Sequence, residues 1–127
     1  MIEDRVKELM NKHGLWRIAL QEDGGSWVDC ELRRGEVKIV GDTTIIYREI
    51  SKLEQYLDVL MGVVGISHAF KVRDGAVFTI TTNTNRTTVA YNTEVLMVFD
   101  NGSLDIRSSY IDTIASLVSV ALMDVIA

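Results

Sequence analysis

The spacing of apolar side chains along the chain predicts three helices. Between residues 2 and 13 the apolar positions recur every three or four residues, and Gly14 offers a left-handed cap directly afterwards. Residues 43–65 show the same helical spacing over a longer stretch. The last twenty residues do so as well, with almost no strongly polar side. The pattern therefore predicts a first helix ending near residue 13, a long central helix and a terminal helix.

Between the helices, apolar and polar residues alternate in a way that is typical of strands. A three-residue Asp-Gly-Gly loop places Leu20 opposite Val28, so both apolar sets share one face. A three-residue Arg-Asp-Gly loop likewise places Phe70 opposite Phe78. An Asn-Gly pair before residues 104–106 predicts a third hairpin, or alternatively the entry into the terminal helix.

The long helix carries two apolar stripes, which lie roughly 115° apart around its axis. The main stripe includes Leu57 and is expected to face the sheet. One sheet face can cover only one stripe, so the chain is expected to form a homodimer that covers the other. The terminal helix allows two interpretations, burial within the chain or cover by a second chain. The second stripe of the long helix consists of Ile45, Tyr56, Val59 and Val63.

Length and charge narrow the class of protein. At 127 residues the chain fits a single domain, and no stiff linker divides it because it contains no proline. It has 13 basic and 18 acidic side chains, so its net charge of −5 repels phosphate backbones. Nucleic acid is therefore not an expected partner.

Membrane insertion is not expected either. Polar residues interrupt the last twenty positions, among them Asp112, Ser116 and Asp124, and no run of about 18 uncharged apolar residues exists. The start of the chain shows no basic and apolar leader, and a single cysteine cannot form an intramolecular disulfide. A cytoplasmic location is expected.

Candidate chemistry is sparse. Cys30 alternates onto an apolar strand face, where a thiol is usually an inert core group. His13 ends a helix and His68 lies on another apolar strand face, and neither has further ligands at a spacing that suits zinc. The polar residues 81–89 are typical of a hairpin end or loop, with a binding role left open. No catalytic group, metal or cofactor is expected.

The order helix, two strands, long helix, three or more strands and terminal helix resembles the roadblock/longin-type domains. The resemblance is to the roadblock family of dynein light chains and to prokaryotic relatives that associate with small Ras-like GTPases. It is carried by "DRVKELMNKHG", "EDGG", "LDVLMGVVG", "HAFKVRDGAVFTI" and "EVLMVFDNGS". It implies an α+β fold for residues 1–127, with an antiparallel sheet of about five strands between the long helix and paired N- and C-terminal helices.

The resemblance also implies a function and an interface. Residues 66–72 would form the paired edge strand of a homodimer, and the second stripe of the long helix would meet the partner's helix. The chain would act as a non-catalytic platform that binds or regulates a small Ras-like GTPase. The interface residues would be Tyr56, Val59, Val63, His68, Phe70 and Val72.

Two other functions stay open. A small acidic secretion-chaperone-like dimer that binds an extended client peptide has the order helix, three strands, helix, strands, helix, which fits if residues 37–40 form a third strand. A small hydrolase that uses Cys30 or His68 belongs to another class. The number of strands before the long helix separates the first two functions, because two strands favour the GTPase platform and three favour the chaperone.

Overall fold

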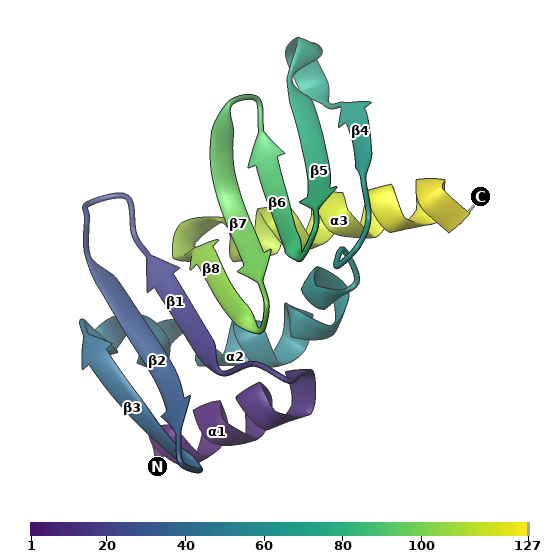
Figure 1. Cartoon of the computed structure of the whole chain (residues 1–127). Coiled ribbons are helices and arrows are strands. Elements are labelled where there is room, and N and C mark those ends of the chain that lie inside the picture. The colour runs from purple at the N-terminus through teal and green to yellow at the C-terminus, as the bar shows by residue number, and fades with distance from the viewer. Residues whose placement is uncertain (127) are drawn as a thin grey trace.

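A computed structural model describes residues 1–126, which form three α-helices and eight strands (Figure 1). The helices are α1 (Ile2–His13), α2 (Thr43–Met61) and α3 (Ile111–Ile126). Two short 3-10 turns, Arg73–Gly75 and Ser108–Tyr110, precede β5 and α3. The strands are β1 (Arg17–Gln21), β2 (Trp27–Arg33), β3 (Glu36–Gly41), β4 (His68–Lys71), β5 (Val77–Asn83), β6 (Arg86–Tyr91), β7 (Glu94–Asp100) and β8 (Ser103–Arg107).

The strands form one mixed sheet in the order β3-β2-β1-β8-β7-β6-β5-β4. Strands β1 and β8 run parallel, and all other neighbours are antiparallel. The prediction of an antiparallel sheet of about five strands is therefore wrong. One reason is the additional strand β3. A turn at Arg34 and Gly35, with φ angles of 52° and 78°, reverses the chain so that β3 pairs with β2.

The polar segment 81–89 accounts for another part of this difference. It forms the end of the β5–β6 hairpin, which confirms one of the two expected interpretations, but residues 86–89 belong to a strand, β6, that was not expected. Strand β6 pairs with β5 on one side and β7 on the other, so its backbone is hydrogen-bonded despite a weak apolar pattern. Thr87 is buried there, and its hydroxyl lies 3.0 Å from that of Thr82. Tertiary pairing therefore outweighs the local preference for a loop.

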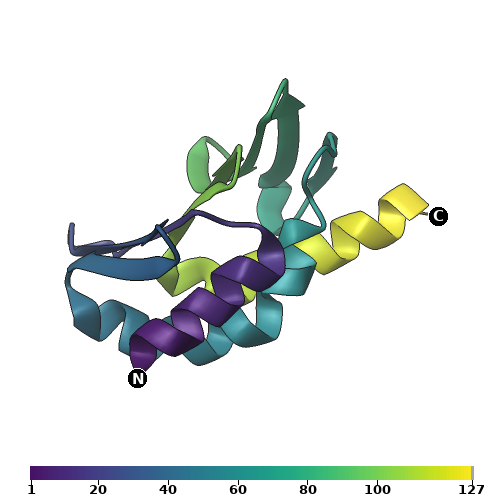
Figure 2. The same cartoon turned by 60° about the horizontal axis from the view of Figure 1, so that its bottom comes forward.

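All three helices lie on one side of the sheet (Figure 2). The expected arrangement, with the sheet between the long helix and two paired terminal helices, is wrong. Helix α2 instead lies between α1 and α3 and contacts both. Its second apolar stripe is thus largely covered within the chain, because Ile45 and Val63 are buried and Tyr56 and Val59 are half-buried.

The local registers that the loops predict are confirmed. Leu20 pairs with Val28, and Phe70 pairs with Phe78. The Asn-Gly pair forms the turn of the third hairpin, with φ of 47° at Asn101, and does not lead directly into α3. These turns keep the apolar side chains of each hairpin on the face that packs against the helices.

Helix ends also follow local chemistry. Gly14 has a φ of 67° and caps α1 where the sequence predicts its end. The carboxylate of Asp42 accepts a hydrogen bond of 3.1 Å from the Thr44 amide and so caps the start of α2. Helix α2 ends at Met61, earlier than the expected residue 65. Within residues 1–126, no helix is both long enough and apolar enough to span a membrane.

Candidate functional site

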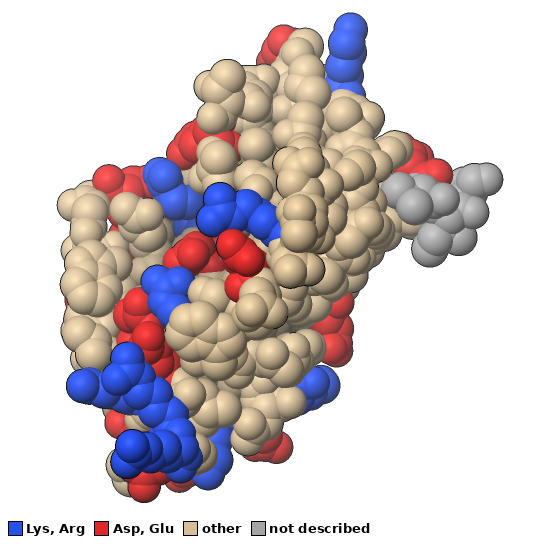
Figure 3. All heavy atoms as spheres, viewed as in Figure 1, with Lys and Arg blue, Asp and Glu red and all other residues tan. Residues whose placement is uncertain are grey.

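The face of the sheet opposite the helices is not covered by any described element (Figure 3). Residues that are neighbours across its strands include Ala19, Asp29 and Asp105 in the middle and Thr81 and Thr88 towards β4. Acidic and basic side chains gather over β1, β2 and β8, whereas few charges lie over β4, β5 and β6. The open face therefore has a charged centre beside a nearly neutral half.

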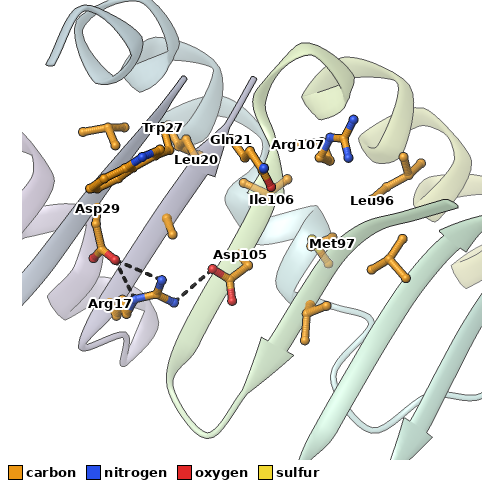
Figure 4. A pocket seen from close by; sticks show the side chains of 14 residues that line it. Arg17, Leu20, Gln21, Trp27, Asp29, Leu96, Met97, Asp105, Ile106 and Arg107 are labelled. Atoms are coloured by element: carbon orange, nitrogen blue, oxygen red, sulfur yellow. Dashed lines mark hydrogen bonds and ion pairs between the residues drawn. The ribbon is translucent and has the colours of Figure 1, made fainter. Parts of the chain in front are cut away.

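A groove with a cavity volume of about 430 Å³ lies in this charged centre, where β1 and β8 run side by side (Figure 4). The small side chain of Ala19 leaves room in its middle. Apolar side chains border this space, and two of them are largely exposed, Trp27 at 48% and Val95 at 46%. The other apolar lining residues are Val98, Leu96 and four residues whose side chains are buried towards the helices, Leu20, Val28, Met97 and Ile106.

An irregular register shapes the β7 wall of the groove. Val89 pairs with Met97, but the next residue, Ala90, pairs with Val95, which leaves Leu96 as an extra residue in β7. Such a bulge changes the direction of the side chains beside it. Leu96 and Met97 are both buried, although they are consecutive in the chain, while Val95 stays exposed at the rim.

At one end of the groove, Arg17 links strands β2 and β8 through its hydrogen bonds. Its Nε donates to Asp29 Oδ2 at 3.0 Å, and its Nη1 donates to Asp105 Oδ1 at 3.0 Å (Figure 4). Burial alone would lower the pKa of Arg17, but the hydrogen bonds and charges of both carboxylates outweigh it and raise the pKa. Asp29 Oδ1 is buried and has no hydrogen-bond partner among the described residues, so this carboxylate is incompletely satisfied.

Arg107 occupies the other end of the groove. Its Nη2 donates to Asp23 Oδ1 at 2.9 Å and lies 3.1 Å from Glu94 Oε1. The hydrogen bond to Asp23, joined by the charge of Glu94, raises the pKa of Arg107. Each end of the groove thus combines one guanidinium with two carboxylates.

The residues expected at a dimer interface fall into two groups. Tyr56, Val59 and Val63 belong to α2 and the turn after it, and Val63 is fully buried within the chain. His68, Phe70 and Val72 lie on or next to β4, at one edge of the sheet, and are half-buried. The Phe70 ring packs 5.3 Å from that of Phe78, and His68 Nε2 lies 3.6 Å from Asp124. Contact of either group with a second chain stays a prediction.

The candidate reactive groups lie outside the groove. Cys30 is fully buried on the face of the sheet that meets the helices, and burial raises its pKa to about 12. This disfavours Cys30 as a nucleophile, because the thiolate is the reactive form. Burial also lowers the pKa of His13, whose Nε2 lies 3.6 Å from Asp58. Within the described part of the chain, no three His, Cys, Asp or Glu side chains lie close enough to hold a metal ion.

Comparison of the chain with protein-family models, curated proteins and solved structures gives no match. The class of protein is therefore described from its fold and its groove. It is an α+β domain whose sheet is covered by helices on one side and carries a charged, partly apolar groove on the other.

Sequence reasoning did not find this groove, although part of its signal was present. In β1 and β2 the residues between the apolar positions include Arg17, Ala19, Trp27 and Asp29. Alternation assigns them to the face away from the core. A tryptophan and an alanine on that face are an indication that it is more than a solvated surface. The partner residues on β7 and β8 follow only from the strand order.

Proposed function

We propose that this chain is a non-catalytic module that binds an extended segment of another protein and acts as a homodimer, in the manner of small acidic secretion chaperones. The observation that supports it most is the strand β3, which pairs with β2 over residues 36–41. Three strands therefore precede the long helix, which is the order that favours a chaperone over a GTPase platform.

The open face gives this proposal a physical basis. An extended segment needs a long, accessible surface with places for alternate side chains. The groove offers apolar side chains, among them Trp27 and Val98, beside the charged groups of Arg17 and Arg107. The net charge of −5 also agrees with the acidic character that the proposal requires.

The proposed homodimer uses the surface that the chain leaves partly exposed. The partly exposed residues on α2 are Tyr56 and Val59. Those at the β4 edge of the sheet are His68, Phe70 and Val72. A four-residue edge strand such as β4 has unpaired backbone groups that a second copy can hydrogen-bond. Sedimentation at micromolar concentration tests the dimer, and a species of 14.2 kDa at all concentrations contradicts it.

Capture of partners in the native organism tests the client. Tagged chain is crosslinked in the cell, and the captured partner is digested with protease both in the complex and after release. The expected result is one segment of the partner that is protected in the complex and cut when free. A stoichiometric, folded GTPase whose protection depends on its nucleotide would instead favour the platform function that the roadblock resemblance implies.

A further inference from the structure

A small pocket lies at one end of the sheet, away from the groove. It forms where the β5–β6 turn, the β7–β8 turn and the segment after α2 come together (Figure 1). We infer that this pocket binds one ring of a neutral saccharide. Its cavity volume of about 240 Å³, the volume of about eight water molecules, suits a ligand of that size. The inference goes beyond the proposed function, because the pocket and the groove share no lining residue.

The floor of the pocket is held in place by its own hydroxyl groups. Strand register places Thr82, Thr87 and Phe99 side by side on the face of the sheet that meets the helices. Thr82 Oγ1 donates to the Ile66 carbonyl oxygen at 2.6 Å, and the Gly65 amide donates to Thr87 Oγ1 at 3.3 Å. The two threonine hydroxyls lie 3.0 Å apart. These bonds fix the segment after α2 against β5 and β6, so the pocket is largely preformed.

The rim of the pocket offers free hydrogen-bonding groups. The side chains of Thr84, Asn85 and Asn101 are exposed there, and within residues 1–126 no hydrogen bond joins them to another protein group. A hydroxyl and two amides both donate and accept, so they can pair with ligand hydroxyls in either direction. A sugar ring presents hydroxyls at its edge and C–H groups on its faces. Half-buried Phe99 and Val64, which is 44% exposed, supply apolar surface for those C–H groups.

The pocket carries no charge of its own, since none of its lining side chains is ionisable. The charged residues that flank it in the strands, Arg86 and Asp100, pair with each other at 3.2 Å. Near the end of α2, Asp58 lies 3.6 Å from the Nζ atom of Lys12. A phosphate or carboxylate ligand would need a cation that the pocket lacks, whereas a neutral sugar does not.

Thr84 occupies a backbone conformation that is costly for its side chain. Its φ of 55° lies in the left-handed region, which glycine adopts freely and a β-branched residue rarely does. Asn101 has a φ of 47° on the opposite turn, but asparagine tolerates this region. Strained residues of this kind cluster at binding sites. A role of the Thr84 hydroxyl in holding a ligand accounts for a threonine where glycine would be more stable.

The test follows backbone amide shifts by NMR in isotope-labelled chain during titration with glucose, galactose, mannose and N-acetylglucosamine. At least one of these sugars should cause saturable shifts at the amides of Gly65, Asn85 and Gly102. A Kd on the order of 1 mM is expected for so small a ligand. The amides of Ala19 and Gln21, which line the groove, should not shift.

The Thr84→Gly variant separates a binding role from a structural one. It relieves the strained φ and removes a hydroxyl from the rim, so the urea midpoint should rise while the affinity for the sugar falls about three- to tenfold. Asn101→Gly keeps the left-handed turn, removes one amide and should weaken binding to a similar extent. Arg34→Gly is the matched control, because it relieves a φ of 52° in the β2–β3 turn at the other edge of the sheet. It should leave the Kd unchanged.

Matched ligands test the chemistry of the pocket. The uronic acid of the bound sugar adds a carboxylate and should bind more weakly. Sorbitol keeps the hydroxyls but has no ring, so it should also bind more weakly. The methyl glycoside of the bound sugar distinguishes two sources of the same chemistry. If it binds as well as the free sugar, the source is the end of a glycan chain, and if it does not bind, the source is a free sugar; both results support the inference.

Several outcomes would overturn the inference. The first is the absence of saturable shifts with all four sugars at up to about 50 mM, far above the expected Kd. Equal binding of the uronic acid would reject a neutral ligand, and equal effects of Thr84→Gly and Arg34→Gly would reject the location. A peptide rich in asparagine and serine that shifts these amides when the sugars do not would make the pocket part of the client surface. Failure of partner capture would bear on the proposed function alone.

Discussion

The thiol of Cys30 gives a direct test of how the sheet packs. It lies in the middle of β2, is fully buried and faces the helices. Burial raises its pKa from the ordinary 9.0 to about 12, with a further contribution from the charge of Asp29. A disulfide reagent such as dithionitrobenzoate reacts with the thiolate, so native protein should label far more slowly than protein in denaturant.

The size of this difference follows from the pKa. At pH 8 a thiol of pKa 9.0 is about 10% ionised, whereas one of pKa about 12 is about 0.01% ionised, which is a ratio of about a thousand. Complete burial adds a second barrier, because the reagent reaches Cys30 only when the domain opens. For a stability of about 5 kcal/mol, the open fraction is about 2 in 10,000. Either route predicts labelling at least a thousandfold slower than in denaturant.

The assay measures absorbance of the released thiolate at pH 8, with and without denaturant. A native rate within tenfold of the denatured rate would refute the assigned packing of β2. The pH dependence of stability gives a second readout. The folded-state pKa is raised, so the contribution of the protonated thiol is complete below pH 9 and is lost as pH rises towards 12. Cys30→Ala should remove this loss, which is at most about 1.4 kcal/mol per pH unit.

Four further substitutions test other parts of the fold. Gly41→Ala adds a Cβ that would lie 2.4 Å from the Trp27 carbonyl oxygen, at a φ of 104°, so the free energy of unfolding should fall by about 2 kcal/mol or more in urea titrations. Leu57→Lys buries a charge and should abolish folding, whereas Val59→Lys at a half-buried position should leave a folded monomer. Circular dichroism and light scattering decide between them, and an intact Val59→Lys dimer would place the interface elsewhere. Asp42→Ala removes the cap of α2 and should cost about 1 kcal/mol in the same titrations, and an unchanged midpoint would show that the cap is dispensable.

Local features of this fold could be predicted because their causes lie within a few residues. The loop before Trp27 has three residues, so the pairing of Leu20 with Val28 follows from turn length and alternation. Gly14 stops α1 because a residue without a side chain adopts the required backbone angles freely. The same logic gives the hairpin that pairs Phe70 with Phe78.

The sheet order could not be predicted, because its decisive contact joins distant segments. Arg17 and Asp105 are 88 residues apart, yet they share a hydrogen bond where β1 meets β8. No local pattern marks a parallel pair between the second and penultimate elements of a chain. Strand β6 was also missed, since its threonines and arginine give it little apolar alternation. It is stabilised by pairing on both sides, which only the complete sheet provides.

The groove lies where these distant segments meet, and this position explains why it combines apolar and charged groups. The sheet consists of an N-terminal part, β1 to β3, and a C-terminal part, β4 to β8, which are joined only by the pairing of β1 with β8. Arg17 spans this junction, with Asp29 on the N-terminal part and Asp105 on the C-terminal part. Ala19 leaves the junction open beside it. The charges therefore connect the two parts of the sheet, and the same charges border the groove. A substitution at Arg17 would disturb both roles together, whereas Asp105 and Glu94 are exposed enough to change the charge of the groove while the strand pairing remains.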